Sequence, residues 1–168
     1  DELVGLRGKT VVEIGCGDGF FLGVLARMGA DGIGFEPSST YELAREQRGV
    51  QIINGFFDFS GPTSVDGPVD VVVMRHVLEH MEFPAEVLKS LAGPAFQGRP
   101  PEYLFIEVPN AYQLLRDDLY FDFYNDHVHY FSHSSLDRFV RAAGWVPISR
   151  LDSEEEFLVL VCRNETVP

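Results

Sequence analysis

The sequence lacks several features that would assign it to other classes of protein. It has no apolar run long enough to cross a bilayer and no signal-peptide pattern at its start, so we expect neither a membrane partner nor secretion. It has only two cysteines, Cys16 in a glycine-rich stretch and Cys162 in an apolar one. This usage gives no disulfide framework and fits a reducing compartment, so we expect a cytoplasmic protein.

Positive charge is also scarce. The chain has 13 Lys and Arg against 26 Asp and Glu, which gives a net charge of −13 at pH 7. Because this excess works against binding a phosphate backbone, nucleic acid is not an expected partner. At 168 residues the chain has the length of one domain. It opens at Asp1 without an initiator methionine, so we expect a processed chain or a domain excised from a longer one. The sequence leaves the oligomeric state open.

Strand and helix patterns alternate along most of the chain. Short apolar runs predict strands at Val11–Ile14, Gly32–Phe35, Val50–Ile53, Val69–Met74, Tyr103–Val108, Val146–Ser149 and Phe157–Cys162. Helices are predicted at Phe20–Met28, Tyr41–Arg48, Pro84–Leu91 and Ser134–Ala143. Ser38 or Ser39 is the expected cap of the second helix, with Glu42 at capping-box spacing from Ser39. Gly144 is the expected stop of the last helix.

This alternation predicts an α/β fold. We expect a doubly wound, Rossmann-like and mostly parallel seven-stranded sheet, with helices on both faces and an antiparallel edge strand formed by the last two strands. Residues 109–133 interrupt the pattern as an aromatic- and histidine-rich insertion after the fifth strand. Because ligands of open α/β sheets bind beyond the carboxyl ends of the strands, this insertion should cover the crevice. The acidic run Glu154–Glu156 is expected to be a solvated turn.

The most informative stretch is a glycine-rich turn after the first strand. Gly15, Gly17 and Gly19 leave a bare backbone against which a ligand can lie. A dinucleotide fingerprint needs G-x-G-x-x-G, but here the third glycine comes one residue early, which favours a smaller ligand without a pyrophosphate. Glu13 puts a carboxylate beneath the turn, where it favours a ligand with an ammonium group. Glu36 ends the next strand, where it can accept hydrogen bonds from a ribose.

The chain resembles the class I S-adenosylmethionine-dependent methyltransferases. The resemblance rests on four ordered blocks, VVEIGCGDG (11–19), GFEPS (34–38), GFFDF (55–59) and RHVLEH (75–80). It implies that residues 1–168 form a single domain that binds S-adenosylmethionine, with 109–133 as a substrate-covering insertion. The expected activity is methyl transfer to a small-molecule acceptor.

The resemblance also assigns the cofactor contacts. The glycines and Cys16 would surround the methionyl part, Glu36 and Pro37 the ribose, Asp58 and Phe57 the adenine, and Arg75 and His76 the sulfonium. The full expected set is Glu13, Gly15, Cys16, Gly17, Gly19, Glu36, Pro37, Phe57, Asp58, Arg75 and His76. The structural alternatives are a plain tight turn for the glycines, a loop cap for Asp58 and a core position for Phe57.

The segment 123–132 is the expected source of the acceptor chemistry. His127 is the candidate general base, because a neutral imidazole can take a proton near pH 7, and Tyr124 and Asp126 are its candidate helpers. The segment is similar to a Tyr-x-Glu-His pattern of deoxysugar C-methyltransferases, which implies a sugar-related acceptor. Asp126 stands where that pattern has glutamate. The alternative for His127 is a structural hydrogen bond that ties the insertion to the sheet.

No metal is predicted. His76 and His80 lie one helical turn apart, a spacing that can bind a metal ion, but no further ligand is evident near them in the sequence. A second arrangement, Asp126 with His127 and His129, draws all its ligands from one short stretch. Two other functions stay open: a non-catalytic cofactor-binding or scaffold domain and, less favoured, a nicotinamide-dependent oxidoreductase.

Overall fold

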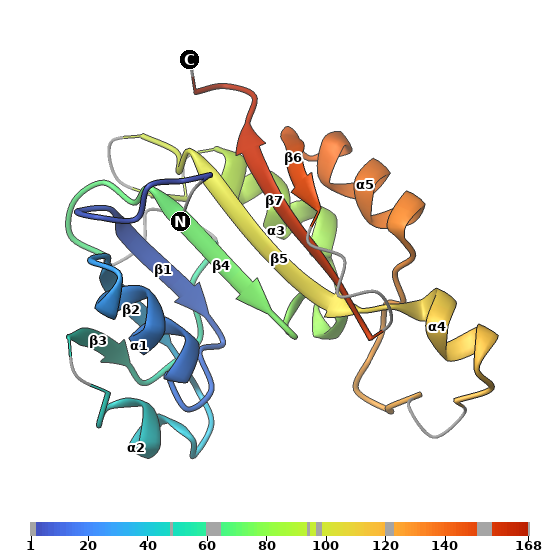
Figure 1. Ribbon diagram of the computed structural model, residues 1–168, viewed down its shortest axis with the longest axis horizontal. Coiled ribbons are helices and arrows are strands. Elements are labelled where there is room, and N and C mark those ends of the chain that lie inside the picture. Colours follow the sequence, from blue (N-terminus) through green and yellow to red (C-terminus); the bar gives the residue numbers. More distant parts are fainter. Residues whose placement is uncertain are drawn as a thin grey trace.

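A seven-stranded sheet forms the centre of the computed structural model, which describes residues 3–47, 49–59, 65–93, 95–96, 99–119, 123–150 and 156–167. The strands are β1 (Thr10–Ile14), β2 (Asp31–Phe35), β3 (Val50–Ile53), β4 (Val71–Arg75), β5 (Tyr103–Pro109), β6 (Trp145–Arg150) and β7 (Phe157–Asn164). Their order in the sheet is β3-β2-β1-β4-β5-β7-β6. The first five are parallel, and β7 runs antiparallel between β5 and β6 (Figure 1). The predicted mixed sheet is confirmed.

Helices lie on both faces of this sheet. They are α1 (Phe20–Arg27), α2 (Tyr41–Ala44), the 3₁₀ helix η1 (Leu78–His80), α3 (Pro84–Ala92), α4 (Ala111–Arg116) and α5 (His133–Ala142). In Figure 1, α1 lies in front of the β1 and β2 side of the sheet, whereas α3 and α5 lie behind it. Within the described part of the chain, no helix is long and apolar enough to cross a membrane.

Two helix ends differ from the predicted ones. The second helix stops at Ala44, and the capping box expected from Ser39 and Glu42 is not formed: the N-cap is Thr40, which makes no side-chain cap bond. The cap that does form is at α5, where the Ser132 hydroxyl accepts from the Ser135 N–H and the Ser135 hydroxyl accepts from the Ser132 N–H. Ser135 takes the place of the glutamate of a usual capping box, because its hydroxyl accepts from the backbone N–H of the N-cap residue.

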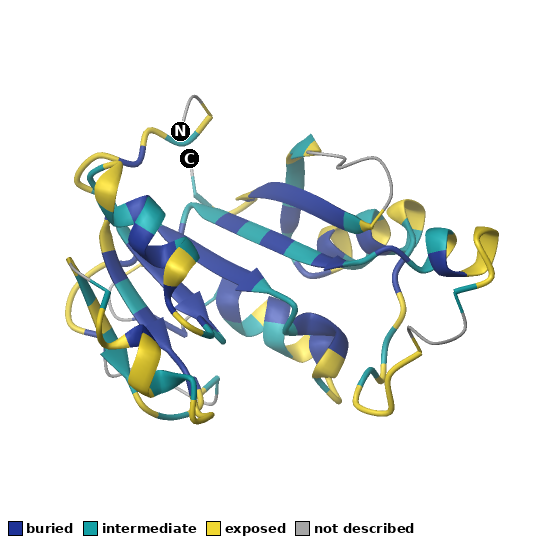
Figure 2. Cartoon of the chain, turned by 60° about the horizontal axis from the view of Figure 1, so that its bottom comes forward, coloured by how far each residue is buried: buried dark blue, intermediate teal, exposed yellow. Residues whose placement is uncertain are grey.

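The core has two layers, one on each face of the sheet. The larger cluster packs α3 and α5 against the strands, and its largest member is Trp145, which is fully buried and donates from Nε1 to the Leu88 carbonyl oxygen at 2.9 Å. The smaller cluster lies under α1 and contains Leu22, Leu25 and Val73. Figure 2 shows the central strands buried along their length. Apolar packing therefore covers both faces of the sheet, so a ligand site is expected at the ends of the strands.

The carboxyl ends of β1, β4 and β5 meet at one edge of the sheet, at the bottom in Figure 1. The strand order reverses between β1 and β4, and a crevice at such a point is the usual ligand site of this architecture. The insertion after β5 begins with α4 and returns to the sheet at Phe131, whose carbonyl oxygen accepts from the Ala111 N–H at 2.8 Å. The insertion therefore starts and ends beside this crevice.

Trp145→Phe should destabilise the fold by about 1–3 kcal/mol, because it removes the bond to Leu88 and leaves a small void. Urea unfolding followed by circular dichroism measures the loss, since Trp145 is the single tryptophan of the chain. Ile148→Val, on the same strand but 41% exposed, is the control and should change stability by about 0.5 kcal/mol or less. Equal losses for the two variants would contradict the packing described above.

Candidate functional site

The glycine-rich turn between β1 and α1 has the bare backbone that the sequence predicts. Gly15, Gly17 and Gly19 have φ angles of 70°, 56° and 72°, in the left-handed region that favours glycine. A Cβ at Gly15 would lie 2.5 Å from Val77 Cγ2, so the first glycine is required by the close approach of the segment after β4. A Cβ at Gly17 would meet nothing within 4 Å. The second glycine therefore borders open space.

Glu36 holds this turn in place from the end of β2. Its Oε2 accepts from the Gly17 N–H at 2.8 Å, and its Oε1 accepts from the Ser38 N–H at 2.8 Å. The side chain is only 6% exposed. Because a carboxylate has about four acceptor positions, two remain for a ligand hydroxyl pair after these bonds are made. Glu36 thus has both a structural role and free acceptor capacity.

A pocket of about 360 Å³ opens between this turn and the segment after β4. Five of the predicted cofactor residues line it: Gly15, Glu36, Pro37, Phe57 and His76. The other lining residues are Ile14, Phe35, Gly55, Phe56, Phe59, Val77, His80 and Met81. Its size and its mostly apolar walls with a few polar groups are those of a small-ligand site. We refer to it as the cofactor pocket.

The remaining predicted cofactor residues lie outside these walls. Asp58 is exposed, although its neighbours Phe57 and Phe59 line the pocket. The Cys16 side chain is buried and fills the space above Gly34, so only its backbone faces the turn. Burial raises the pKa of the Cys16 thiol to about 12, and the nearby Glu13 and Glu36 add to the shift. The thiol therefore stays protonated at neutral pH.

Arg75 lies on the other face of the sheet from the pocket. Its guanidinium donates to Glu107 Oε1 at 2.9 Å and lies 4.4 Å from the centre of the Phe21 ring. The parallel register of β4 and β5 pairs Arg75 with Glu107, which explains why the two side chains meet. Because side chains alternate along a strand, the Arg75 side chain points toward α1. Arg75 is therefore not among the residues that line the pocket, where the predicted contact with a sulfonium would be made.

His76, the next residue, lines the cofactor pocket and reaches the same Glu107 oxygen as Arg75. Its φ of 52° is unusual for a residue with a side chain and turns the backbone at the end of β4. Its Nε2 lies 2.9 Å from Glu107 Oε1, and its Nδ1 lies 3.7 Å from Glu79 Oε1. The Glu79 carboxylate is the main cause of a raised pKa of His76; burial opposes the shift and Glu107 reinforces it.

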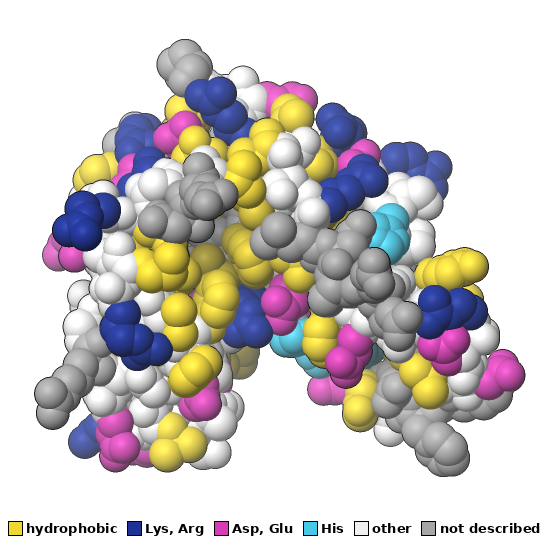
Figure 3. All heavy atoms as spheres, in the orientation of Figure 1, with side chains coloured by type: hydrophobic (Ala, Val, Ile, Leu, Met, Phe, Trp, Pro, Cys, Tyr) yellow, Lys and Arg dark blue, Asp and Glu magenta, His cyan; other side chains and the backbone are white. Residues whose placement is uncertain are grey.

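A second pocket, of about 380 Å³, lies beside the cofactor pocket. It is lined by His76, Glu79, Pro109, Gln113, Leu114, Leu119, Tyr124, His127, Glu156 and Phe157. His76 is a wall of both pockets, so the two cavities adjoin. We refer to this cavity as the acceptor pocket. In Figure 3 it belongs to the wide notch between the α1–α2 side and the α4 side of the molecule, where basic, acidic and histidine side chains meet.

The predicted catalytic residues are only partly brought together. His127 and Tyr124 both line the acceptor pocket, and their ring centres lie 5.1 Å apart. Asp126, the expected helper of His127, is beside His80 instead: its backbone oxygen lies 3.0 Å, and its Oδ2 3.5 Å, from His80 Nδ1. His127 Nδ1 is buried and has no hydrogen-bond partner within the described part of the chain.

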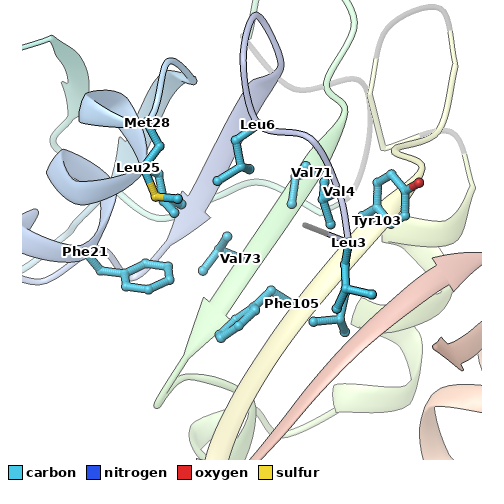
Figure 4. Close-up of a pocket in the computed structure, with 11 residues that line it drawn as sticks. Leu3, Val4, Leu6, Phe21, Leu25, Met28, Val71, Val73, Tyr103 and Phe105 are labelled. Atoms are coloured by element: carbon cyan, nitrogen blue, oxygen red, sulfur yellow. The ribbon is translucent and has the colours of Figure 1, made fainter. Parts of the chain in front are cut away.

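A third hollow, of about 190 Å³, lies on the α1 face of the sheet and has a different character. Figure 4 shows its wall of apolar side chains, which come from the N-terminal segment, α1, β4 and β5. Tyr103 carries the one hydroxyl among the side chains that line it. Such a surface cannot orient a polar cofactor, so this hollow is not the candidate site.

Comparison with known proteins agrees with this geometry. A family model described as a methyltransferase domain matches residues 2–150. The chain belongs to this methyltransferase family. It is 31% identical over 134 residues to the ubiquinone biosynthesis O-methyltransferase of Pseudomonas paraeruginosa, a match that covers 68% of this chain and 56% of that one. The chain spans about half the length of the curated relatives that it matches.

Solved methyltransferase structures share the fold. The S-adenosylmethionine-dependent methyltransferase of Mesorhizobium loti superposes with a TM-score of 0.73 at 13% identity, covering 95% of this chain and 93% of that one. Magnesium protoporphyrin IX methyltransferase of Synechocystis, solved with bound SAH, gives 0.69 at 16% identity, covering 95% and 75%. With the family match, these structures confirm the resemblance to class I S-adenosylmethionine-dependent methyltransferases and the expected cofactor.

Two carboxylates of this candidate site, Glu107 and Glu79, were not predicted from the sequence. Glu107 is a charged residue in an otherwise apolar strand, and it pairs with Arg75 in the parallel register of β4 and β5. A charged residue at this position could have been recognised in the sequence as a candidate site residue. Glu79 is part of the RHVLEH block, but its importance depends on the insertion that folds over it. That contact has no local signature in the sequence.

Glu13, which the sequence analysis expects as a carboxylate beneath the turn, is almost fully buried and does not line the cofactor pocket. Its Oε2 has no hydrogen-bond partner among the residues described here. Burial raises the pKa of Glu13 to about 8, while the Arg75 charge and a bond from the Leu22 backbone act in the opposite direction. At neutral pH the carboxyl group of the ligand-free protein is therefore largely protonated.

Glu13→Gln should become more stable relative to the wild type as the pH rises from 5 to 8. In this range the unfolded chain releases the Glu13 proton and the folded chain retains it. The free energy of unfolding of the wild type therefore falls by up to about 1.4 kcal/mol per pH unit, whereas Glu13→Gln has no such loss. Urea unfolding at several pH values measures the difference. Glu86→Gln, at an exposed position, is the control. The difference between its free energy of unfolding and that of the wild type should not change with pH. A constant offset for Glu13→Gln as well would contradict the raised pKa.

Proposed function

We propose that this chain is the catalytic domain of an S-adenosylmethionine-dependent methyltransferase that acts on an oxygen atom of a small-molecule acceptor. The adjoining cofactor and acceptor pockets, with His76 as their shared wall, are the observation that carries this proposal. When bound in the cofactor pocket, S-adenosylmethionine supplies an activated methyl group on a sulfonium. Methyl transfer depends mainly on alignment, which two adjoining pockets can impose.

The cofactor pocket has groups that suit each part of this cofactor. Glu36 offers acceptor positions for ribose hydroxyls, and Gly17 leaves its backbone open to the methionyl part. Phe57 lies within an aromatic cluster with Phe35 and Phe59, so its role is a wall of the pocket rather than a free stacking platform. The exposed Phe56 is the better candidate to cover the adenine ring. Asp58 remains our proposed partner of the adenine amino group.

An oxygen acceptor is favoured by the relatives. Several of them are named ubiquinone biosynthesis O-methyltransferases. The acceptor pocket contains the rings of Tyr124, His127 and Phe157, which suit an aromatic acceptor. The sugar-related acceptor was implied by the similarity of the segment 123–132 to deoxysugar C-methyltransferases, but Asp126 stands where their pattern has glutamate, and its carboxylate lies beside His80. We therefore prefer a hydroxylated aromatic compound to a sugar.

We assign His127 to the acceptor oxygen. It lines the acceptor pocket and has a ring nitrogen with no partner within the described segments. The general-base role expected from the sequence lacks its orienting carboxylate, because Asp126 does not reach the ring. The charge of −13 argues against a nucleic-acid acceptor.

Glu36→Gln should weaken the binding of S-adenosylhomocysteine by about tenfold to a hundredfold, because hydrogen bonds to a charged group contribute about 1.5–3 kcal/mol. The amide would also lose one of the two backbone N–H bonds that shape the turn. Isothermal titration calorimetry measures the affinity, and Glu42→Gln, 67% exposed on α2, should bind like the wild type. Binding that is unaffected in Glu36→Gln, or absent in the wild type, would refute the cofactor assignment.

His127→Ala should lower kcat/KM for acceptor methylation by about a hundredfold or more while S-adenosylhomocysteine still binds, because only the acceptor side loses a group. The assay is S-adenosylhomocysteine release with a panel of mono- and dihydroxylated benzoates. A wild-type chain that binds the cofactor but methylates none of them would favour the non-catalytic scaffold instead.

A further inference from the structure

A buried carboxylate and two imidazoles meet at the wall of the acceptor pocket. Glu79 and His80 come from η1, and His127 comes from the insertion. One ligand atom of each residue lies within 4.8 Å of the other two. In the sequence, no third ligand is evident near the pair His76 and His80, because His127 is distant along the chain. The fold brings His127 to η1.

Glu79 is the least expected member of this cluster. Its side chain is about 1% exposed, yet neither carboxylate oxygen has a hydrogen-bond partner in the part of the chain that is described. His76 Nδ1 lies 3.7 Å from Oε1, which is beyond hydrogen-bond distance but close enough for an ion pair when His76 is protonated. A carboxylate buried in this way is costly unless a cation or a donor completes its surroundings.

The two imidazoles each have a nitrogen for such a cation. His80 Nδ1 lies 3.0 Å from the Asp126 backbone oxygen, which can only accept, so Nδ1 carries the proton and the lone pair lies on Nε2. A hydrogen bond from the second ring nitrogen is what orients metal-binding histidines. The His127 Nδ1 is buried without a partner, and the two rings lie edge to face with their centres 4.6 Å apart.

The main chain brings these residues together without help from a ligand. The Glu79 carbonyl oxygen accepts from the Val128 N–H at 2.9 Å and from the His129 N–H at 3.1 Å. These two bonds attach the insertion to η1 directly beside His127. The cluster is therefore a preformed feature of the fold.

We propose that Glu79, His80 and His127 bind a divalent transition-metal ion such as Zn²⁺. Two imidazoles and one carboxylate are a ligand set for such ions, whereas Mg²⁺ prefers oxygen ligands. Metal–nitrogen bonds of about 2.1 Å need ligand atoms about 3–4 Å apart, so the histidine side chains would close in by about 1 Å on binding. Glu79 and His127 line the acceptor pocket, so an ion held by them would border that pocket.

The role of the ion follows if the proposed methyl transfer is correct. An acceptor hydroxyl bound to the ion loses its proton to water more easily, because the metal lowers the pKa of a bound oxygen. The resulting oxygen anion forms the new O–CH₃ bond as the S–CH₃ bond breaks. His127 then acts as a ligand rather than as a general base.

Zn²⁺ titration of the tag-free protein tests the site without cofactor or acceptor. We expect one Zn²⁺ per chain by calorimetry and a higher Tm when Zn²⁺ is present. His127→Ala and Glu79→Gln should each weaken Zn²⁺ binding by about tenfold or more and abolish the rise in Tm. His129→Ala, in the same segment but outside the cluster, is the matched control and should bind like the wild type.

The Tm measured without metal separates a ligand role from a merely structural one. Glu79→Gln should then melt at or above the wild-type temperature, because it removes a buried carboxylate whose oxygens have no hydrogen-bond partner among the described residues. A lower metal-free Tm together with unchanged Zn²⁺ affinity would show a structural role and overturn the proposal. So would equal Zn²⁺ affinity in all four proteins, or the absence of saturable binding. Because none of these readouts needs methyl transfer, the proposed function can fail while the metal site stands.

Discussion

The parallel pairing of β4 with β1 on one side and β5 on the other is the constraint on which the site depends. It sets Val73 beside Glu13 and Arg75 beside Glu107, so that three ionisable side chains gather on the α1 face near the strand ends. It also brings the turn after β1 against the segment after β4, where Val77 fills the space that a side chain at Gly15 would need. Both pockets open from this one edge of the sheet.

The charges at this edge are unevenly compensated. Glu107 accepts from Arg75 and lies within 2.9 Å of His76 Nε2, so its carboxylate has two partners. Glu13 and Glu79, by contrast, are buried with carboxylate oxygens that have no hydrogen-bond partner in the described regions. Such groups reduce the stability of the folded chain, and Glu79 lies at the wall of the acceptor pocket. The proposed metal ion would complete the surroundings of Glu79.

Local patterns explain which parts of this site the sequence could predict. The glycine spacing and the position of Glu36 are set within one strand–turn–helix unit and its neighbour, so both followed from the residues themselves. The helix expected over 41–48 ends at Ala44, its capping box does not form, and Ala44 is its one buried residue, so little packing stabilises a longer helix. These differences concern element ends, where local signals are weakest.

The acceptor side was harder to predict because its contacts are long-range. Asp126 and His127 are adjacent in sequence, which suggested a dyad, but the turn formed by Tyr124–His127 directs one toward His80 and the other toward Glu79. The two bonds from the insertion to the Glu79 carbonyl oxygen, together with the contact of His80 Nδ1 with the Asp126 backbone oxygen, hold that arrangement.

His76 shows how backbone strain connects the two halves of the site. Its left-handed backbone conformation costs about 1–2 kcal/mol for a residue with a Cβ. A glycine there would avoid the cost but would remove the wall that the two pockets share. The conformation is held because the His76 N–H donates to the Glu107 carbonyl oxygen at 2.9 Å while the ring reaches the Glu107 side chain. One glutamate of β5 thus holds both the backbone and the ring of the residue that is a wall of both pockets. The separation of the two pockets is therefore set by the sheet itself and not by the insertion.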